Sequence, residues 1–187
     1  MRGRLVYVMG PSGAGKDSLL DMLRHMFCGQ PVAFPRRYIT RPASAGGERH
    51  IPISPEQFRD LEKQGYFSLH WASHGFLYGI AASTDTVLES GVSLIVNGSR
   101  AAFPQALSRY PDLIPVLVTV PPEILRERLV MRGRESGEEL EERLKAAFRP
   151  VPEENAVPFW IRLDNSGPLE QNARTLTKEL KKALALA

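Results

Sequence analysis

The chain has 187 residues, of which 43% are hydrophobic and 24% charged, as in one ordinary globular domain rather than a disordered or fibrous protein. The net charge is only +3 and the basic residues are scattered, which argues against nucleic acid as a partner, and no apolar stretch is long enough to span a membrane. The single cysteine, Cys28, cannot form an internal disulfide and indicates a reducing, cytoplasmic setting.

Short apolar runs alternate with helical patterns along the chain. Runs typical of buried strands cover residues 5–9, 32–39, 67–71, 77–80, 92–96, 114–120 and 159–163. Helical patterns cover residues 16–27, 84–90, 122–131, 138–148 and 169–186. Ser54, followed by Pro55 and then by Gln57, predicts the start of another helix. Strands that alternate with helices predict an α/β fold, with a parallel sheet flanked by helices on both faces.

The loop after the first predicted strand matches the phosphate-binding motif G-x-x-x-x-G-K-[ST] up to its last letter. It reads Gly10-Pro11-Ser12-Gly13-Ala14-Gly15-Lys16. Its glycines let backbone N–H groups turn toward phosphate oxygens, and the N-terminus of the next helix adds positive potential. A chance glycine-rich turn would not be expected between an apolar strand and an amphipathic helix. We therefore expect a P-loop that binds ATP, with Lys16 reaching the β- and γ-phosphates.

Asp17 stands where the motif has a hydroxyl residue that ligates magnesium. A bare carboxylate at this position would repel a triphosphate. The usual acidic partner ends a neighbouring strand, yet neither the run 94–97 nor the run 118–121 ends in an acid. One interpretation is that Asp17 replaces that carboxylate and holds Mg²⁺, directly or through water, with Ser18 as the available hydroxyl. The other is that Asp17 merely stabilises the helix N-terminus through the helix dipole.

A second feature is a concentration of arginine, which makes up 18 of the 24 basic residues. Four arginines fall within fourteen residues: Arg36, Arg37, Arg41 and Arg49. The arginine side chain grips phosphate through two parallel hydrogen bonds. A solvated basic loop is the alternative, but prolines and glycines shape this segment. The segment therefore predicts a second phosphate site, and a small phosphorylated ligand as the partner.

The chain resembles the guanylate kinase family of nucleoside monophosphate kinases, which has the P-loop NTPase fold. The segments GPSGAGK, TRP with GGE, GYFSLHWASHGFLYG and PPEILRERLVMRGRESGEELEERL follow that family's order over nearly the whole chain. The resemblance implies a single kinase domain with a core (1–35, 81–125 and 157–187), an acceptor-binding region (36–80) and a helical lid (126–150).

The same resemblance implies roles for single residues. Arg41 and Tyr78 would hold the acceptor phosphate, and Asn165 would lie near the adenine. The lid arginines that clamp the donor phosphates would be Arg128, Arg132 and Arg143.

Three departures argue against guanine as the acceptor base. His70 replaces the glutamate that reads guanine, Ile95 replaces the aspartate of a D-V-Q-G segment, and Arg36 and Arg37 replace small hydroxyl residues. A site built to hydrogen-bond a base loses affinity heavily without those bonds. Purine-reading groups are lost here, and phosphate-reading groups are gained.

The segments GKDSLL, RRYITRPAS, LYG and VNGSRA resemble the ribose 1,5-bisphosphate phosphokinase family of phosphonate metabolism. That resemblance implies transfer of the ATP γ-phosphate onto the sugar's 1-phosphate, which yields 5-phosphoribosyl 1-diphosphate (PRPP). The implied catalytic groups are Lys16, Arg41, Arg132 and Arg143, together with Mg²⁺. The implied substrate-binding residues are Arg36, Arg37, Arg41, Arg49, Tyr78, Asn97, Ser99 and Arg100. For the last three, a purely structural role at the end of a strand remains an alternative.

Two other functions stay open at this point. One is a kinase for a nucleoside monophosphate or another small acceptor. The other is a non-catalytic guanylate-kinase-like binding module, although such modules lose the phosphate loop and this chain keeps it. The sequence also leaves a homodimer open.

Overall fold

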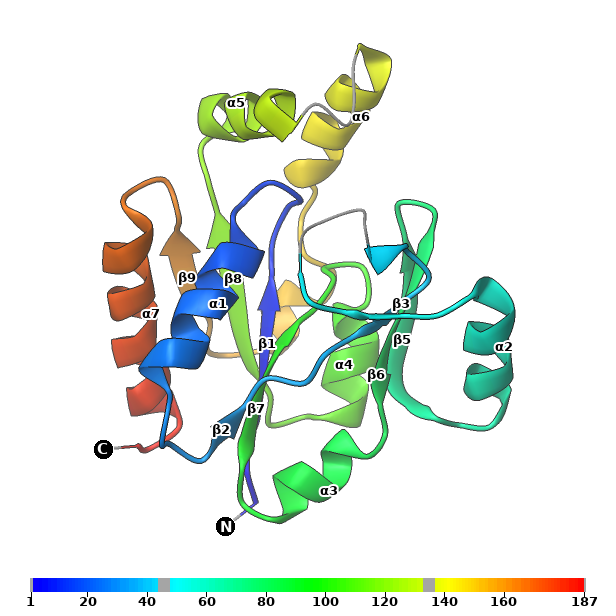
Figure 1. Cartoon of the computed structure of the whole chain (residues 1–187). Helices are drawn as coiled ribbons and strands as arrows, with labels where there is room; N and C mark the ends of the chain where they lie inside the picture. The colour runs from blue at the N-terminus through cyan, green and yellow to red at the C-terminus, as the bar shows by residue number, and fades with distance from the viewer. Residues whose placement is uncertain (1, 44–47, 133–136, 187) are drawn as a thin grey trace.

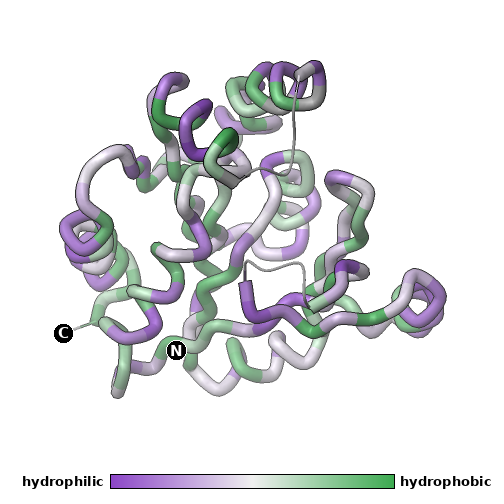
Figure 2. The backbone as a smooth tube through the Cα atoms, turned by 45° about the horizontal axis from the view of Figure 1, so that its top comes forward, coloured by the Kyte–Doolittle hydropathy of each residue, from purple (hydrophilic) through white to green (hydrophobic). Residues whose placement is uncertain are grey.

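A computed structural model describes residues 2–43, 48–132 and 137–186, apart from the side chains of residues 132, 139 and 143. Its centre is a parallel sheet of five strands in the order β2-β7-β1-β8-β9 (Figure 1). These strands are β1 (Leu5–Met9), β2 (Val32–Ala33), β7 (Ser93–Asn97), β8 (Ile114–Thr119) and β9 (Ile161–Asp164). The three inner strands, β7, β1 and β8, are buried along most of their length, because both faces of a parallel sheet are covered. Hydrophobic segments accordingly run through the middle of the molecule (Figure 2).

Helices cover the two faces of this sheet and form two hydrophobic cores. Helices α1 (Lys16–Met26) and α7 (Leu169–Ala183) pack on one face, where Leu19, Leu23 and Leu176 are fully buried. Helices α3 (Thr84–Glu89) and α4 (Phe103–Arg109) pack on the other face. The expected α/β P-loop fold is therefore confirmed.

A smaller sheet lies beside the core in the order β4-β3-β6-β5. Its strands are β3 (Tyr38–Ile39), β4 (Ile51–Pro52), β5 (Phe67–Ser73) and β6 (Phe76–Ala81), and helix α2 (Pro55–Lys63) packs beside it. The predicted capping box is present: Gln57 N–H donates to Ser54 Oγ, and Ser54 N–H donates to Gln57 Oε1.

One predicted strand is wrong. Residues 32–39 do not form a single strand but divide between β2, at the edge of the parallel sheet, and β3 in the smaller sheet. Pro35 lies between the two and has no N–H to donate to a strand ladder. The chain therefore passes from one sheet to the other within this run, and Arg37 directly precedes β3. Strand β4, helix α4 and a short 3₁₀ helix (Glu154–Ala156) had no sequence prediction.

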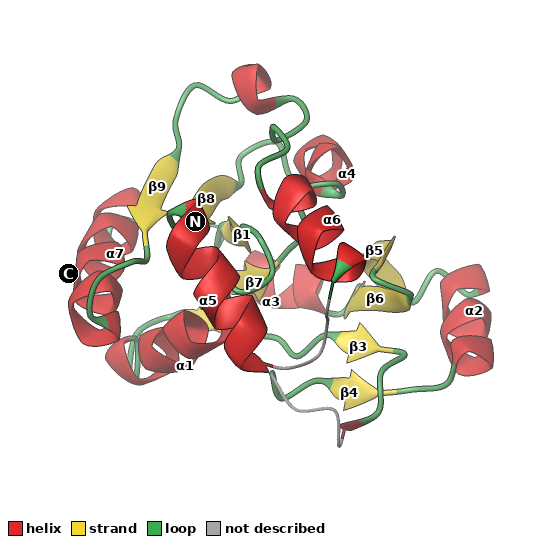
Figure 3. Cartoon of the chain, turned by 90° about the horizontal axis from the view of Figure 1, so that it is seen from above, coloured by secondary structure: helices red, strands yellow, loops and turns green. Residues whose placement is uncertain are grey.

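Two helices lie over the carboxyl ends of the parallel strands. Helices α5 (Pro122–Arg132) and α6 (Glu138–Ala147) sit next to each other there, as the view from above shows (Figure 3). Arg126 Nη2 lies 2.8 Å from Glu141 Oε1 and joins the two helices. Among the described residues, no helix is both long enough and apolar enough to cross a membrane.

Candidate active site

The phosphate loop follows β1 and ends at Gly15, the N-cap of α1. Gly15 has φ 82°, and a Cβ added there would lie 2.6 Å from Asn165 Nδ2. A Cβ on Gly10 would lie 2.2 Å from the carbonyl oxygen of Val118. Larger residues are therefore excluded at both positions. Lys16 Nζ donates to the carbonyl oxygens of Gly10 and Pro11, both at 2.8 Å, so the ammonium group lies across the mouth of the loop.

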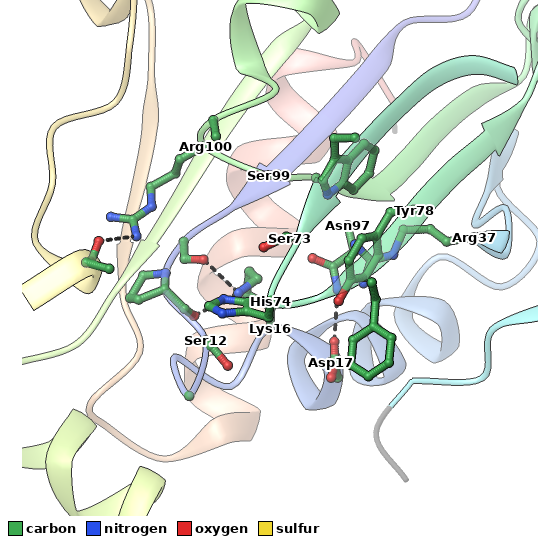
Figure 4. Close-up of a pocket in the computed structure, with 18 of the residues that line it drawn as sticks. Ser12, Lys16, Asp17, Arg37, Ser73, His74, Tyr78, Asn97, Ser99 and Arg100 are labelled. Atoms are coloured by element: carbon green, nitrogen blue, oxygen red, sulfur yellow. Dashed lines mark hydrogen bonds between the residues drawn. The ribbon is translucent and has the colours of Figure 1, made fainter. Parts of the chain in front are cut away.

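A cavity of about 710 Å³ opens in front of this loop (Figure 4). It lies where the phosphate loop, the smaller sheet and the loop after β7 meet. It brings together these predicted site residues: Gly10, Pro11, Ser12, Gly13, Gly15, Lys16, Asp17, Arg37, Arg41, Tyr78, Asn97, Ser99 and Arg100. Segments far apart in the sequence thus converge on a single basic cavity.

One wall of the cavity is a stack of aromatic rings and a guanidinium group. Trp71 and Tyr78 face each other across β5 and β6 with ring centroids 5.6 Å apart and an angle of 3° between the planes. The Arg37 guanidinium carbon lies 5.0 Å from the centroid of Tyr78 and 5.7 Å from that of Trp71. Glu48 holds the same guanidinium in a two-point ion pair, with Arg37 Nε to Oε1 and Arg37 Nη2 to Oε2 both at 2.8 Å. Arg37 is thereby fixed in place.

Asp17 meets the end of β7 rather than standing alone. Asn97 Nδ2 donates to Asp17 Oδ1 at 2.9 Å and to Glu48 Oε2 at 3.2 Å, while Asn97 Oδ1 is buried and has no hydrogen-bond partner among the described residues. In most P-loop proteins the helix supplies a hydroxyl group and the strand supplies a carboxylate. Here the helix supplies the carboxylate and the strand supplies an amide. The helix and the strand thus still contact each other at this point, but the carboxylate lies on the helix instead of on the strand.

Arg41 lies in the cavity with its Nε buried and without a hydrogen-bond partner in the described part of the chain. The imidazole ring of His50 contacts the backbone of the segment that contains Arg41. Nε2 of His50 lies 2.8 Å from the carbonyl oxygen of Arg41, and Nδ1 lies 3.1 Å from that of Glu48. His50 thereby links the backbone at Arg41 to the backbone at Glu48, and both of these residues line the cavity.

Tyr7 positions the loop that follows β7. Its hydroxyl accepts a hydrogen bond from Ser99 N–H at 2.9 Å and donates one to the Ser99 carbonyl oxygen at 3.0 Å. Ser99 thus holds its place through backbone contacts. The Arg100 guanidinium donates to the carbonyl oxygens of Ala146, Ala147 and Arg149, at and just beyond the C-terminal end of α6. Burial lowers the pKa of Arg100, and the positive charge of Arg149 adds to this effect.

The buried hydroxyl of Tyr7 is expected to make the stability of the fold depend on pH in the alkaline range. Burial raises the pKa of Tyr7 from 10.0 to about 12, so between these values the phenol ionises in the unfolded chain but not in the folded one. Stability is therefore expected to fall as pH rises from about 10 to about 12, by up to about 3 kcal/mol. Urea unfolding at several pH values measures this. Tyr7→Phe should be about 1–3 kcal/mol less stable at pH 8 and should lose this part of the pH dependence; an identical slope in the variant would contradict the assignment.

A second cavity, of about 360 Å³, lies on the other side of the phosphate loop. Its lining includes Ser18, Arg128, Met131, Asn165 and Leu169. Asn165 Nδ2 donates to the Ala14 carbonyl oxygen at 2.7 Å, and Arg128 Nη2 donates to the Asn165 carbonyl oxygen at 2.9 Å. Arg128 Nη1 is buried and lacks a hydrogen-bond partner within the described residues. The phosphate loop thus lies between two cavities, and both have arginine in their walls.

Not every predicted site residue reaches a cavity. Arg36 and Arg49 are exposed and line neither cavity, and Ser18 lies on the side opposite Asp17's cavity. The side chains of Arg132 and Arg143 lie outside the described residues. Glu48 and Trp71 also line the main cavity but were not predicted as site residues, although both lie in segments, GGE and GYFSLHWASHGFLYG, that carry the resemblance to guanylate kinases.

The residues present fit a magnesium ion. The described residues contain no cluster of three or more histidine, cysteine or acidic side chains that could cage a metal ion. Magnesium does not need such a cage, since it commonly uses one or two carboxylates together with substrate phosphates and water. Asp17, at the phosphate loop and beside Asn97, whose Oδ1 has no hydrogen-bond partner in the described part of the chain, offers this donor set.

Comparison with known proteins identifies the family. The ribose 1,5-bisphosphate phosphokinase PhnN of Desulfomicrobium baculatum is 51% identical over 174 residues, which cover 92% of this chain and 91% of that protein. The protein of the same name from Azotobacter vinelandii is 44% identical over 183 residues, which cover 97% and 98% of the two chains. The chain belongs to the ribose 1,5-bisphosphate phosphokinase family. The resemblance inferred from the sequence is thereby confirmed, although no family model matches the chain.

Solved structures support the fold of this phosphokinase family member. Guanylate kinase from Anaplasma phagocytophilum superposes with a TM-score of 0.70 at 15% identity, over 98% of this chain and 87% of that one. A sugar kinase from Janibacter sp. HTCC2649 gives a TM-score of 0.54 at 20% identity, over 99% of this chain and 98% of that one. At these identities the likeness concerns the fold alone, and the guanylate kinase-like architecture is confirmed.

Proposed function

We propose that the chain transfers the γ-phosphoryl group of ATP onto the 1-phosphate of ribose 1,5-bisphosphate, giving 5-phosphoribosyl 1-diphosphate and ADP. The observation that carries this proposal is the main cavity, where the phosphate loop faces a wall of arginine and stacked aromatic rings. Of the described lining residues, Asp17 and Glu48 carry carboxylates, and both are engaged by Asn97. His70 lies outside the cavity, 3.0 Å from Glu62 Oε1. The arrangement suits phosphates better than a guanine base.

The donor would bind across the phosphate loop. Its nucleoside would occupy the second cavity, against Arg128 and Asn165, and its phosphates would extend toward Lys16. Lys16 would exchange its two carbonyl partners for phosphate oxygens. Asp17 would hold Mg²⁺ directly or through water, and the ion would supply positive charge that stabilises the transferred phosphoryl group.

The acceptor would bind in the main cavity with a phosphate on Arg41 and on the Arg37–Tyr78 wall. Its attacking oxygen needs no general base, because the second pKa of a phosphate monoester is near 6 and the oxygen is already anionic at neutral pH. That oxygen forms the new bond to the γ-phosphorus as the bond to the bridging β–γ oxygen breaks, and ADP leaves. The protein's task is to align the two phosphates and to spread the negative charge.

The proposal is tested by a coupled ADP-release assay with ribose 1,5-bisphosphate, GMP and gluconate as acceptors. We expect kcat/KM for ribose 1,5-bisphosphate to exceed that for the other two by about 100-fold or more. Turnover with GMP alone would reject the proposal. Failure of magnesium-ATP to bind would instead indicate a non-catalytic module.

A further inference from the structure

The side-chain amide of Asn97 contacts both halves of the main cavity. We propose that Asn97 and Glu48 form a positioning link through which acceptor binding and magnesium-nucleotide binding strengthen each other. This inference rests on the proposed function, because it takes a sugar phosphate as the acceptor. Neither residue needs to touch the transferred group to play this part.

The acceptor end of the link is the ion pair between Arg37 and Glu48. The two side chains are only 12% and 14% exposed, and Glu48 uses both carboxylate oxygens on the guanidinium. Arg37 also lies over the Tyr78 ring, so its position is set before any ligand arrives. A dianionic phosphate that binds Arg37 must compete with Glu48 for the same N–H groups and must repel its charge.

The donor end of the link is the contact between Asn97 and Asp17. Asn97 is 7% exposed, and its Nδ2 serves Asp17 and Glu48 at once. Two carboxylates are thus drawn toward one neutral amide, where they repel each other. A cation bound at Asp17 would relieve that repulsion and would attract Glu48 away from Arg37.

Acceptor binding and cation binding therefore both favour the same shift of Glu48, away from Arg37. The acceptor phosphate displaces Glu48 from Arg37, and the cation at Asp17 stabilises Glu48 on the side of Asn97. Each ligand lowers the free-energy cost of binding the other. Such coupling is reciprocal, so the factor by which the nucleotide tightens acceptor binding must equal the factor by which the acceptor tightens nucleotide binding.

Titration calorimetry on the full chain tests the link without turnover. The probes are ribose 1,5-bisphosphate and a magnesium complex of a non-hydrolysable ATP analogue, each titrated alone and in the presence of the other. For the unmodified chain we expect coupling of about 5-fold or more, in the usual range for linked sites. The same experiment without magnesium should show coupling reduced to less than about 2-fold, because no cation at Asp17 then attracts Glu48 away from Arg37.

Two variants interrupt the link at different points. Glu48→Gln keeps the size of the side chain and an oxygen for Arg37 but removes the charge, and Asn97→Ala removes the amide. Each should reduce the coupling to less than about 2-fold, and the double variant should lose no more than either single one. Glu62→Gln is the matched control, because Glu62 is an acid of the same region that pairs with His70 outside the cavity. It should leave the coupling unchanged.

The outcomes separate this inference from the proposed function. If both ligands bind and Glu48→Gln retains the full coupling, the link is wrong and the proposed function stands. If ribose 1,5-bisphosphate does not bind at all, both are wrong. Melting temperatures of each variant distinguish loss of coupling from loss of folding, since a misfolded variant would lose nucleotide binding as well.

Discussion

A double exchange, Asp17→Thr with Asn97→Asp, is expected to restore most of the activity that either change alone removes. Asp17→Thr takes away the carboxylate at the phosphate loop, and Asn97→Asp places a second acid against it. Each should lower kcat by about 10²–10³-fold, the range for one preorganised charge-stabilising group. The double variant returns to the commoner arrangement, with a hydroxyl on the helix and a carboxylate on the strand. We expect it to recover to within about 10-fold of the original rate.

Initial rates across a magnesium titration measure this prediction. The Asp17→Thr variant should need more magnesium for half-maximal rate, and the double variant should not. Asp60→Asn, on the exposed face of α2, is a control for loss of one acidic charge. If Asp17→Thr has an unchanged magnesium dependence, Asp17 acts only on the helix N-terminus. If the double variant is no better than the worse single variant, the hypothesis that Asp17 replaces the carboxylate of the strand is wrong.

Removal of Arg41 is the second change with a large expected effect. Its guanidinium lies in the cavity, and its buried Nε–H group, which has no hydrogen-bond partner among the residues that the structure describes, could donate to a phosphate. Arg41→Met should lower kcat/KM for the acceptor by about 10²–10³-fold, because a charge-assisted fork is lost where negative charge accumulates. Arg41→Lys should recover only part of this loss, since an ammonium group cannot make two parallel bonds.

Steady-state kinetics with each substrate varied in turn separate the possible roles of Arg41. We expect KM for ATP to change by less than about 3-fold, because the second cavity is untouched. Arg59→Met removes an exposed arginine of the same region and should leave all parameters unchanged. A large loss of ATP affinity in Arg41→Met, with acceptor binding preserved, would reassign Arg41 to the donor.

The phosphate loop could be read from the sequence because its elements are local. A strand, a glycine-rich turn and a helix follow one another within 22 residues, and their order specifies the geometry. The contact that explains Asp17 could not be read in this way. Asn97 lies 80 residues further along the chain, and only the pairing of β1 with β7 brings the two together.

The arginine-rich segment shows a different limit. Sequence reasoning assigned Arg36, Arg37, Arg41 and Arg49 alike to the acceptor, because spacing alone does not reveal which side chains face a cavity. In the structure Arg37 and Arg41 line it, whereas Arg36 and Arg49 are exposed. The alternation of side chains in an extended segment already separates Arg36 from Arg37, but the direction of the cavity depends on how the smaller sheet packs against the core.

Phosphorus NMR of the reaction mixture tests the central claim most directly. With ATP, magnesium and ribose 1,5-bisphosphate, we predict two mutually coupled diphosphate resonances from the sugar's C1 position. A 5-phosphate resonance should remain that of a monoester, and ADP should accumulate in equal amount. The account is contradicted if ribose 1,5-bisphosphate is unchanged while GMP in a parallel sample is converted to GDP.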